Sequence, residues 1–221
     1  MQVATERSAK KNTSKSALRD YAEAIIIALL LALVIRAFVI QAFKIPSGSM
    51  KPTLLIGDHI LVNKFIYGVR LPYWNKEIIH ISSPERQNIV VFRYPVDPSK
   101  DFIKRVIGLP GDTVRIQAKQ VFVNEQPLSE PYAVHSDGRL LPTSVSPRDN
   151  MDSVVVPPHS LFVMGDNRDE SYDSRFWKFV DFSDLRGKAF VIYWSWNSDG
   201  ELTLSPRQGY VRWNRIGRLL H

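Results

Sequence analysis

Two serines flank a single glycine in the segment KIPSGSMKPTLLIGD, which covers residues 44–58. A serine hydroxyl can attack a carbonyl carbon when a neighbouring base takes its proton. A serine in a loop rich in glycine and proline is also a common turn residue without any chemical role. Ser47 and Ser49 are therefore candidate nucleophiles, and each needs a base from elsewhere in the chain.

The sequence shows none of the usual bases for such a serine. The five histidines lie outside any recognisable triad motif, and the chain has no G-x-S-x-G nucleophile elbow. The sequence leaves open a triad whose members come together only in the folded protein. The S-x-x-K pattern occurs at Ser8–Lys11, inside a polar segment, and we interpret it as coincidence.

A lysine in the segment DFIKRVIGLPGD, residues 101–112, is another candidate base. As a strand, this segment places Lys104 between Phe102 and Val106 on one face. On an edge strand, the side chains of Lys104 and Arg105 would extend to water. Burial would instead lower the lysine pKa from about 10.4 to near 8, at a cost of roughly 3 kcal/mol. The neutral amine could then act as a base, and the sequence leaves both alternatives open.

A third segment, GDNRDESYDSR at residues 165–175, concentrates charges of both signs. Its spacing does not match that of a calcium-binding loop. One interpretation is a solvated acidic loop. The other is a salt-bridged turn that holds neighbouring groups in place.

The chain after residue 43 predicts a mainly β domain. Segments such as HILVNKFIYG, NIVVFRYP and KAFVIYWSW are rich in β-branched and aromatic residues, with Gly, Pro, Asp or Asn at their ends. Fourteen prolines disfavour long helices, and a short turn at Phe182–Arg186 is the one further helical candidate. We expect antiparallel β-sheet over residues 44–114 and 156–221.

Residues 115–155 differ from this pattern. They are polar and rich in loop-forming residues, with a hairpin signal at Val121–Pro127. We therefore predict that residues 115–155 form a small subdomain inserted into the β domain.

The N-terminal part of the chain predicts a membrane anchor. Residues 1–21 form a basic tail, and residues 22–43 are mostly apolar, with Glu23 and Arg36 as the charged residues. As a helix, residues 22–43 would be about 33 Å long, which spans a bilayer. A cleavable signal peptide would need a small-x-small site after the apolar run, and none follows it. A buried core helix would leave the basic tail unexplained, so we expect a signal anchor with its N-terminus in the cytoplasm.

The composition excludes several kinds of site. The chain has no cysteine, which rules out disulfides, zinc–thiolate sites and cysteine nucleophiles. A net charge of +7 suits anionic lipid or nucleic acid, and charge alone does not choose between them. With the predicted anchor, we expect contact with a phospholipid membrane, no nucleic acid, no metal and no cofactor.

Together the three segments resemble bacterial type I signal peptidase (leader peptidase), a family of membrane-anchored proteases with a serine/lysine dyad. The segments PSGSMKPTL, GDHILVNKFIYG, NIVVFRYP, DFIKRVIGLPGD and GDNRDESYDSR occur here in the family's order. The resemblance implies a fold of the signal peptidase/LexA-like type: an antiparallel β catalytic domain with an inserted β subdomain, after one transmembrane helix. It also implies an endopeptidase that cleaves signal peptides from exported preproteins after small-x-small motifs.

The resemblance assigns roles to individual residues. Ser49 would be the nucleophile of an acyl-enzyme mechanism and Lys104 its general base. The Ser47 hydroxyl and the Ser49 N–H would stabilise the oxyanion, and Ser171 would orient Lys104. Structural ion pairs are implied for Arg105, Asp166, Asp173 and Arg175. Substrate pockets are implied for Phe43, Ile45, Met50, Leu54, Ile60, Val91 and Ile103, with Tyr172 narrowing one of them.

Two positions depart from the family pattern, and several rival functions stay open. Gln87-Asn88 stands where the family commonly has Gly-Asp, and Trp177-Lys178 where it has Trp-Gly. LexA-type self-cleaving repressors share the dyad but need a DNA-binding domain, whereas this chain has a predicted anchor. A membrane-tethered β domain that binds secretory proteins without cutting them is a second rival. An inactive relative is disfavoured, because all four dyad and supporting residues are present.

The resemblance also implies a location and partners. Signal peptides of preproteins would be the substrate. The chain would cross the bacterial inner membrane once, with the catalytic domain on the extracytoplasmic side. A thylakoid membrane is the alternative location.

Overall fold

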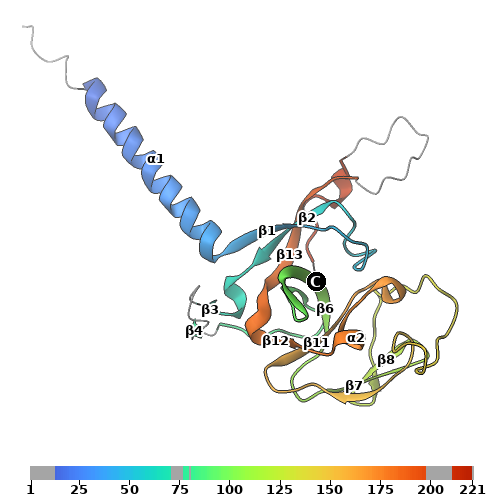
Figure 1. The fold of residues 1–221 in the computed structure, drawn as a ribbon. Coiled ribbons are helices and arrows are strands. Elements are labelled where there is room, and N and C mark those ends of the chain that lie inside the picture. Colours follow the sequence, from blue (N-terminus) through green and yellow to red (C-terminus); the bar gives the residue numbers. More distant parts are fainter. Residues whose placement is uncertain (1–12, 71–76, 80, 198–210, 221) are drawn as a thin grey trace, which may run out of the picture. The chain divides into compact units, whose positions relative to one another are not determined.

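Antiparallel strand pairing dominates the chain after residue 39. The computed structural model describes residues 13–70, 77–79, 81–197 and 211–220. The main sheet has seven strands in the order β1-β2-β13-β5-β6-β11-β12, and every neighbouring pair is antiparallel. Figure 1 labels β1, β2, β6, β11, β12 and β13 of this sheet. The strand bounds are β1 Ile40–Lys44, β2 Asp58–Asn63, β5 Ile89–Tyr94, β6 Asp97–Gly108, β11 Ser160–Met164, β12 Val180–Asp181 and β13 Leu185–Ser195. The prediction of a mainly β, antiparallel domain is confirmed.

The segment between β6 and β11, residues 109–159, is called the annex here. It contains a four-stranded sheet in the order β10-β7-β8-β9. Its strands are β7 Thr113–Gln117, β8 Gln120–Val123, β9 Gln126–Pro127 and β10 Met151–Val155. The predicted hairpin is present: Asn124 and Glu125 join β8 to β9 with φ angles of 52° and 62°. Positive φ at both turn positions matches the right-handed twist of the flanking strands.

Apart from the N-terminal helix, the remaining elements are short. Strands β3 Val69–Arg70 and β4 Glu77–Ile79 pair with each other, and helix α2 spans Ser174–Trp177. The turn predicted at Phe182–Arg186 is a 3-10 turn over Phe182–Asp184, after which β13 begins. The sequence analysis did not predict α2, whose four residues are too few to show a helical period.

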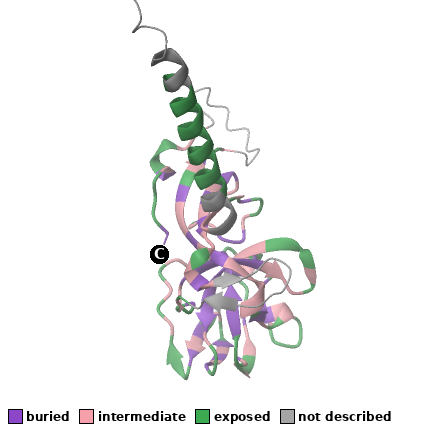
Figure 2. Cartoon of the chain, turned by 90° about the vertical axis from the view of Figure 1, so that its left-hand side faces the viewer, coloured by how far each residue is buried: buried purple, intermediate pink, exposed green. Residues whose placement is uncertain are grey.

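Hydrophobic side chains from alternating strand positions form the core. In β2, every second residue is buried, so Ile60 and Val62 face the interior. In β6, burial is concentrated at the C-terminal end, where the five residues from Lys104 to Gly108 are buried. Figure 2 shows the buried residues gathered on the strands. This packing fixes the direction in which the functional side chains of β6 point.

Helix α1 spans Thr13–Phe38 and belongs to a separate unit, Met1–Val39. The predicted span of residues 22–43 has the wrong boundary, because Ile40–Lys44 form β1 and pair with β2. Apolarity alone does not separate a helix from an adjacent strand whose backbone groups find a partner. The described apolar side chains of α1, such as Ile25 and Leu33, are exposed (Figure 2). Within the described residues, no helix combines the length and the apolarity of a membrane span, and the predicted span is not confirmed.

The close contact of β13 with β2 at Gly187 generates a stability prediction. Gly187 has a φ of +149°, and a Cβ there would lie 2.2 Å from the Asn63 carbonyl oxygen. Since backbone cannot easily move away, Gly187→Ala should lower the free energy of unfolding by about 2 kcal/mol or more. Denaturant unfolding measures this change. Gly138→Ala is the matched control, because a Cβ at Gly138 meets no atom within 4 Å. Equal midpoints for the two variants would contradict the prediction.

Candidate active site

The loop between β1 and β2, residues 45–57, presents the candidate nucleophile. Its ends are joined by hydrogen bonds from Ile45 N to Asp58 O (2.8 Å) and from Gly57 N to Ile45 O (3.0 Å). Inside the loop, Lys51 N donates to Gly48 O at 3.0 Å and so closes a turn around Ser49. Ser49 is 9% exposed. The loop therefore holds one serine in a defined and largely buried position.

The candidate base approaches Ser49 from β6. Lys104 lies opposite Val90 of β5 and is 4% exposed. Its Nζ is 2.6 Å from Ser49 Oγ, within hydrogen-bonding distance. Proton transfer between the two side chains thus needs no rearrangement of the backbone.

Burial changes the acidity of the Lys104 ammonium. Loss of hydration disfavours the charged form and lowers the pKa of Lys104 to about 8. The nearby carboxylates of Asp173 and Asp166 oppose this shift, and the Arg175 guanidinium reinforces it. Of the two alternatives that the sequence left open, the structure has the buried lysine. A substantial fraction of this amine is neutral near pH 8 and can accept a proton.

A buried ion pair on the other face of β6 joins three segments. Arg105 donates from Nε to Asp166 Oδ1 at 2.8 Å and from Nη2 to Asp166 Oδ2 at 2.7 Å. Thr53 of the serine loop also donates to Asp166 Oδ2, at 2.5 Å. The Arg105 guanidinium stacks 3.9 Å from the Tyr132 ring of the annex. This bidentate pair fixes the serine loop, β6 and the loop after β11 in one arrangement.

The charged segment 165–175 is a salt-bridged turn, as the second of its two interpretations proposed. Asp173 accepts two hydrogen bonds of 2.8 Å from the Arg175 guanidinium and one of 3.0 Å from Gly165 N. Arg175 Nη2 also donates to Arg168 O at 2.7 Å. Asp173 and Arg175 are both buried. Their charges are thus satisfied by each other and by backbone groups of the same loop.

Two residues that the sequence analysis did not single out hold this turn against the serine loop. Asn167 donates from its backbone N to Ser49 O at 3.1 Å and from its side chain to Gly48 O at 3.3 Å. A Cβ on Gly165 would lie 2.4 Å from Ser49 O and 2.3 Å from Ser171 Oγ. Only glycine allows so close an approach. The one signal in the sequence was an asparagine and a glycine inside a highly charged loop.

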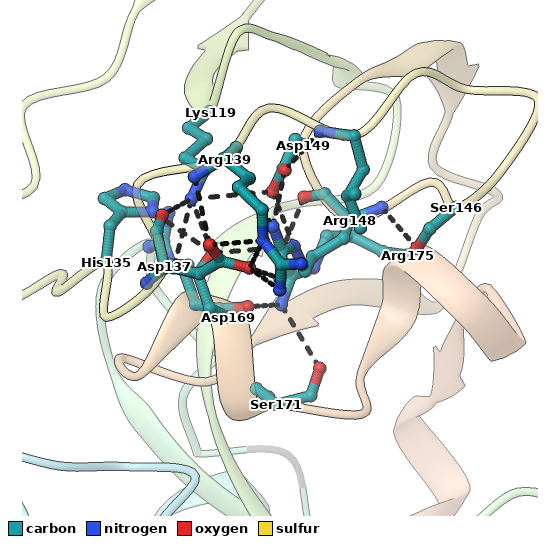
Figure 3. A network of polar contacts seen from close by, with 12 residues as sticks. Lys119, His135, Asp137, Arg139, Ser146, Arg148, Asp149, Asp169, Ser171 and Arg175 are labelled. Carbon is teal, nitrogen blue, oxygen red and sulfur yellow. Dashed lines mark hydrogen bonds and ion pairs between the residues drawn. The ribbon is translucent and has the colours of Figure 1, made fainter.

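The annex holds the 165–175 turn from the other side (Figure 3). Asp169 accepts from Lys119 Nζ at 3.0 Å and from Asp137 N at 2.7 Å. Arg175 Nη1 donates to Arg148 O at 2.9 Å. Beyond this network, Arg168 forms a bidentate pair with Glu130, at 2.9 and 2.6 Å. The annex thereby supports the turn that positions Ser49.

A cleft of about 380 Å³ opens beside Ser49 and Lys104. Its lining residues are Pro46, Ser47, Gly48, Ser49, Asp101, Phe102, Ile103, Lys104, Glu170 and Tyr172. A space of this size holds a short stretch of peptide. Ser47, the candidate oxyanion donor, is exposed at this cleft.

The residues predicted for substrate pockets divide into two groups. Ile103 and Tyr172 line the cleft. The predicted residues Ile45, Met50, Leu54, Ile60 and Val91 are at most 2% exposed and form a core cluster, against which Phe43 packs. These apolar side chains come from inward-facing positions, where burial removes most of their surface from water. Ile45, Met50 and Leu54 thus anchor the serine loop in the core, and none of the residues in this second group lines the cleft.

Ser171, predicted to orient the lysine, lies buried beside Gly165. Among the described residues, its hydroxyl makes no hydrogen bond to Lys104. The structure therefore brings Ser49 and Lys104 into contact, with Ser47 on the cleft and Ser171 close to the Ser49 segment.

Comparison with known proteins places this arrangement in a family. Residues 18–194 match the family model described as signal peptidase, peptidase S26. Signal peptidase I of Pseudomonas fluorescens is 37% identical over 217 residues, covering 85% of this chain and 76% of that protein. Signal peptidase I of Pseudomonas aeruginosa is 38% identical over 216 residues, with the same two coverages. A crystal structure of a signal peptidase I from Enterococcus faecalis matches 49% of this chain and 97% of its own, with 31% identity and a TM-score of 0.40.

The buried amine predicts a pH-dependent stability. Between pH 8 and 10.5 the unfolded chain still carries the Lys104 proton that the folded chain has released, so stability rises with pH. At about 1.36 kcal/mol per pKa unit, wild type should gain about 3 kcal/mol relative to Lys104→Met across this window. Denaturant unfolding of both proteins at several pH values measures the difference.

Lys100→Met supplies the control for this experiment, since it removes an exposed lysine from the same strand. Its stability should stay parallel to that of wild type across the window. Parallel curves for wild type and Lys104→Met would show that the Lys104 amine is not desolvated.

Proposed function

The chain belongs to the signal peptidase family, peptidase S26, and we propose that Ser49 and Lys104 are the nucleophile and general base with which it acts. It is a serine endopeptidase that cleaves signal peptides from preproteins. The observation that carries the assignment of the two residues is the 2.6 Å contact between Lys104 Nζ and Ser49 Oγ in a buried setting. The lowered pKa of Lys104, about 8, supports the role of the base.

The reaction follows from this contact. Lys104 takes the hydroxyl proton as Ser49 Oγ bonds to the scissile carbonyl carbon, which gives a tetrahedral oxyanion. When the oxyanion collapses, the C–N bond breaks and Lys104 gives its proton to the leaving amine. The signal peptide remains on Ser49 as an ester. Lys104 then takes a proton from water as the water oxygen bonds to the ester carbon, and it gives this proton to Ser49 Oγ as the ester C–O bond breaks, which restores the serine.

Two donors would stabilise the oxyanion. Ser47, exposed on the cleft, offers its hydroxyl, and Ser49 offers its own N–H. The turn closed by Lys51 N and Gly48 O contains Ser49 and thereby holds its N–H in place. Preorganised donors of this kind act without reorientation during the reaction.

Ser171 would orient the Lys104 amine once substrate fills the cleft. This role is supported by the position of Ser171, which is buried beside Gly165 where the 165–175 turn meets the Ser49 carbonyl. The cleft itself would accept the small residues of a small-x-small motif. Ile103 and Tyr172 supply apolar surface there, and the exposed Tyr172 ring narrows the space.

Cleavage of a radiolabelled preprotein in detergent tests the assignment. Ser49→Ala and Lys104→Met should abolish formation of mature product, because each removes a group that forms or breaks a bond. Ser47→Ala should lower kcat about a hundredfold, as expected for the loss of one oxyanion donor. Wild type should cut after a small-x-small sequence. Cutting by the first two variants at the wild-type rate would rule out the dyad, and no cutting by wild type of several preproteins would favour a tethered binding domain.

We further propose that the chain is anchored in the cell's inner membrane by a single pass. The basic residues of the tail, residues 1–21, would stay in the cytoplasm, and the β domain would lie on the opposite side. A thylakoid membrane is the alternative location. The exposed apolar side chains of α1 between Ile25 and Leu33 support this proposal, because such a surface needs an apolar environment.

Alkaline carbonate extraction tests the anchor. The full chain, reconstituted into phosphatidylethanolamine–phosphatidylglycerol vesicles, should remain in the membrane pellet. A chain lacking residues 1–39 should be released or bind only at low salt. In cell-derived vesicles of known orientation, digestion by protease added outside should show on which side of the membrane the β domain lies. Release of the full chain by carbonate would contradict the proposal.

A further inference from the structure

Two carboxylates stand in the cleft beside the dyad. Asp101 is paired with Arg186, whose Nε lies 3.1 Å from Asp101 Oδ1. Glu170 is exposed, and across the described part of the chain no cation lies within ion-pair distance of it. The negative charge of Asp101 is thus compensated, whereas that of Glu170 faces the space that a substrate would occupy.

The Glu170 carboxylate is held in place. Asn167 Nδ2 donates to Glu170 Oε2 at 3.1 Å and also to Gly48 O, the carbonyl just before the nucleophile. Glu170 N donates to Asn167 O at 3.1 Å, which fixes the backbone of this turn. One amide therefore links the carboxylate to the serine loop, and the second carboxylate oxygen has no partner among the described residues. A fixed charge in this position interacts with a bound peptide in a defined geometry.

We propose that Glu170 is a specificity-determining residue, which favours lysine or arginine in the substrate close to the scissile bond and disfavours aspartate or glutamate there. The inference rests on the proposed function, because it requires the scissile carbonyl to lie at Ser49 in this cleft. Charges a few ångströms apart near a protein surface discriminate moderately, since water screens them in part. We expect a threefold to tenfold preference in kcat/KM, of about the size that exposed charge pairs give.

Peptide substrates with a single variable position test the proposal. Glutamine, lysine or glutamate is placed in turn at the middle residue of the small-x-small motif and at the first and second residues after the cut. The readout is the ratio of kcat/KM for the lysine peptide to that for the glutamate peptide. Wild type should prefer lysine at one or more of these positions, and Glu170→Gln should bring the ratio to about one. Raising the ionic strength should shrink the wild-type ratio.

Glu125→Gln is the matched control. Glu125 lies on the β8–β9 turn with 66% of its side chain exposed, so its substitution removes the same charge outside the cleft. It should leave the ratio unchanged. If Glu170→Gln slows the cleavage of all three peptides equally, Glu170 acts through Asn167 on the serine loop. This result would overturn the proposal.

The outcomes separate this inference from the proposed function. Wild type that cuts the glutamine peptides but treats lysine and glutamate alike overturns the inference and leaves the protease assignment intact. Wild type that cuts none of the peptides argues against the protease assignment itself. If Glu170→Gln does not fold, the salt dependence of the wild-type ratio decides, because a charge preference must weaken with salt.

Discussion

The burial of the Lys104 amine against Ser49 is the constraint on which the rest of the site depends. A lysine in water is protonated at neutral pH, and only loss of hydration makes it a usable base. Burial would not make Lys104 a base if a carboxylate paired with the amine, because the negative charge would raise the pKa of Lys104 again. The charges of Asp166 and Asp173 act on the Lys104 pKa in this direction, but each carboxylate is paired with its own arginine. The two ion pairs thus keep the lysine unpaired as well as holding the fold together.

The nucleophile is positioned by contacts between three segments, which are the annex, the 165–175 turn and the serine loop. The annex holds the 165–175 turn through Asp169 and Arg168, and that turn holds the Ser49 carbonyl through Asn167. Buried ion pairs are stabilising only when nearly every donor and acceptor is satisfied. Here backbone groups complete the pairs, as Gly165 N does for Asp173 and Arg148 O does for Arg175. Ordered ion pairs therefore lie next to the Lys104 amine, which forms no ion pair with a carboxylate of the described residues.

Local patterns in the sequence predicted the strands, the β8–β9 hairpin and the three segments that meet at the site. They could not decide whether Lys104 is buried, because neighbouring strands and a distant turn exclude water from it. The helix–strand boundary near Phe38 was wrong for a similar reason, since β1 exists only through its pairing with β2. The role of Asn167 is not visible in local sequence, because its partner Gly48 is 119 residues away. The apolar character of Met50 and Ile60 does not show whether a side chain lines the cleft or packs in the core next to it.

The annex leaves and rejoins the main sheet at neighbouring strands, since Gly108 of β6 pairs with Phe162 of β11. The entropic cost of a loop between fixed ends grows only slowly with its length. A chain excursion at this position can therefore lengthen, shorten or acquire a new sheet while the lysine-bearing strand keeps its place. Such exchange is limited by the annex residues that contact the turn at residues 165–175, which are Lys119 at the β7–β8 turn and the segment from Glu130 to Arg148. The β8–β9 turn is free to diverge, whereas Lys119 and residues 130–148 must change together with the active site.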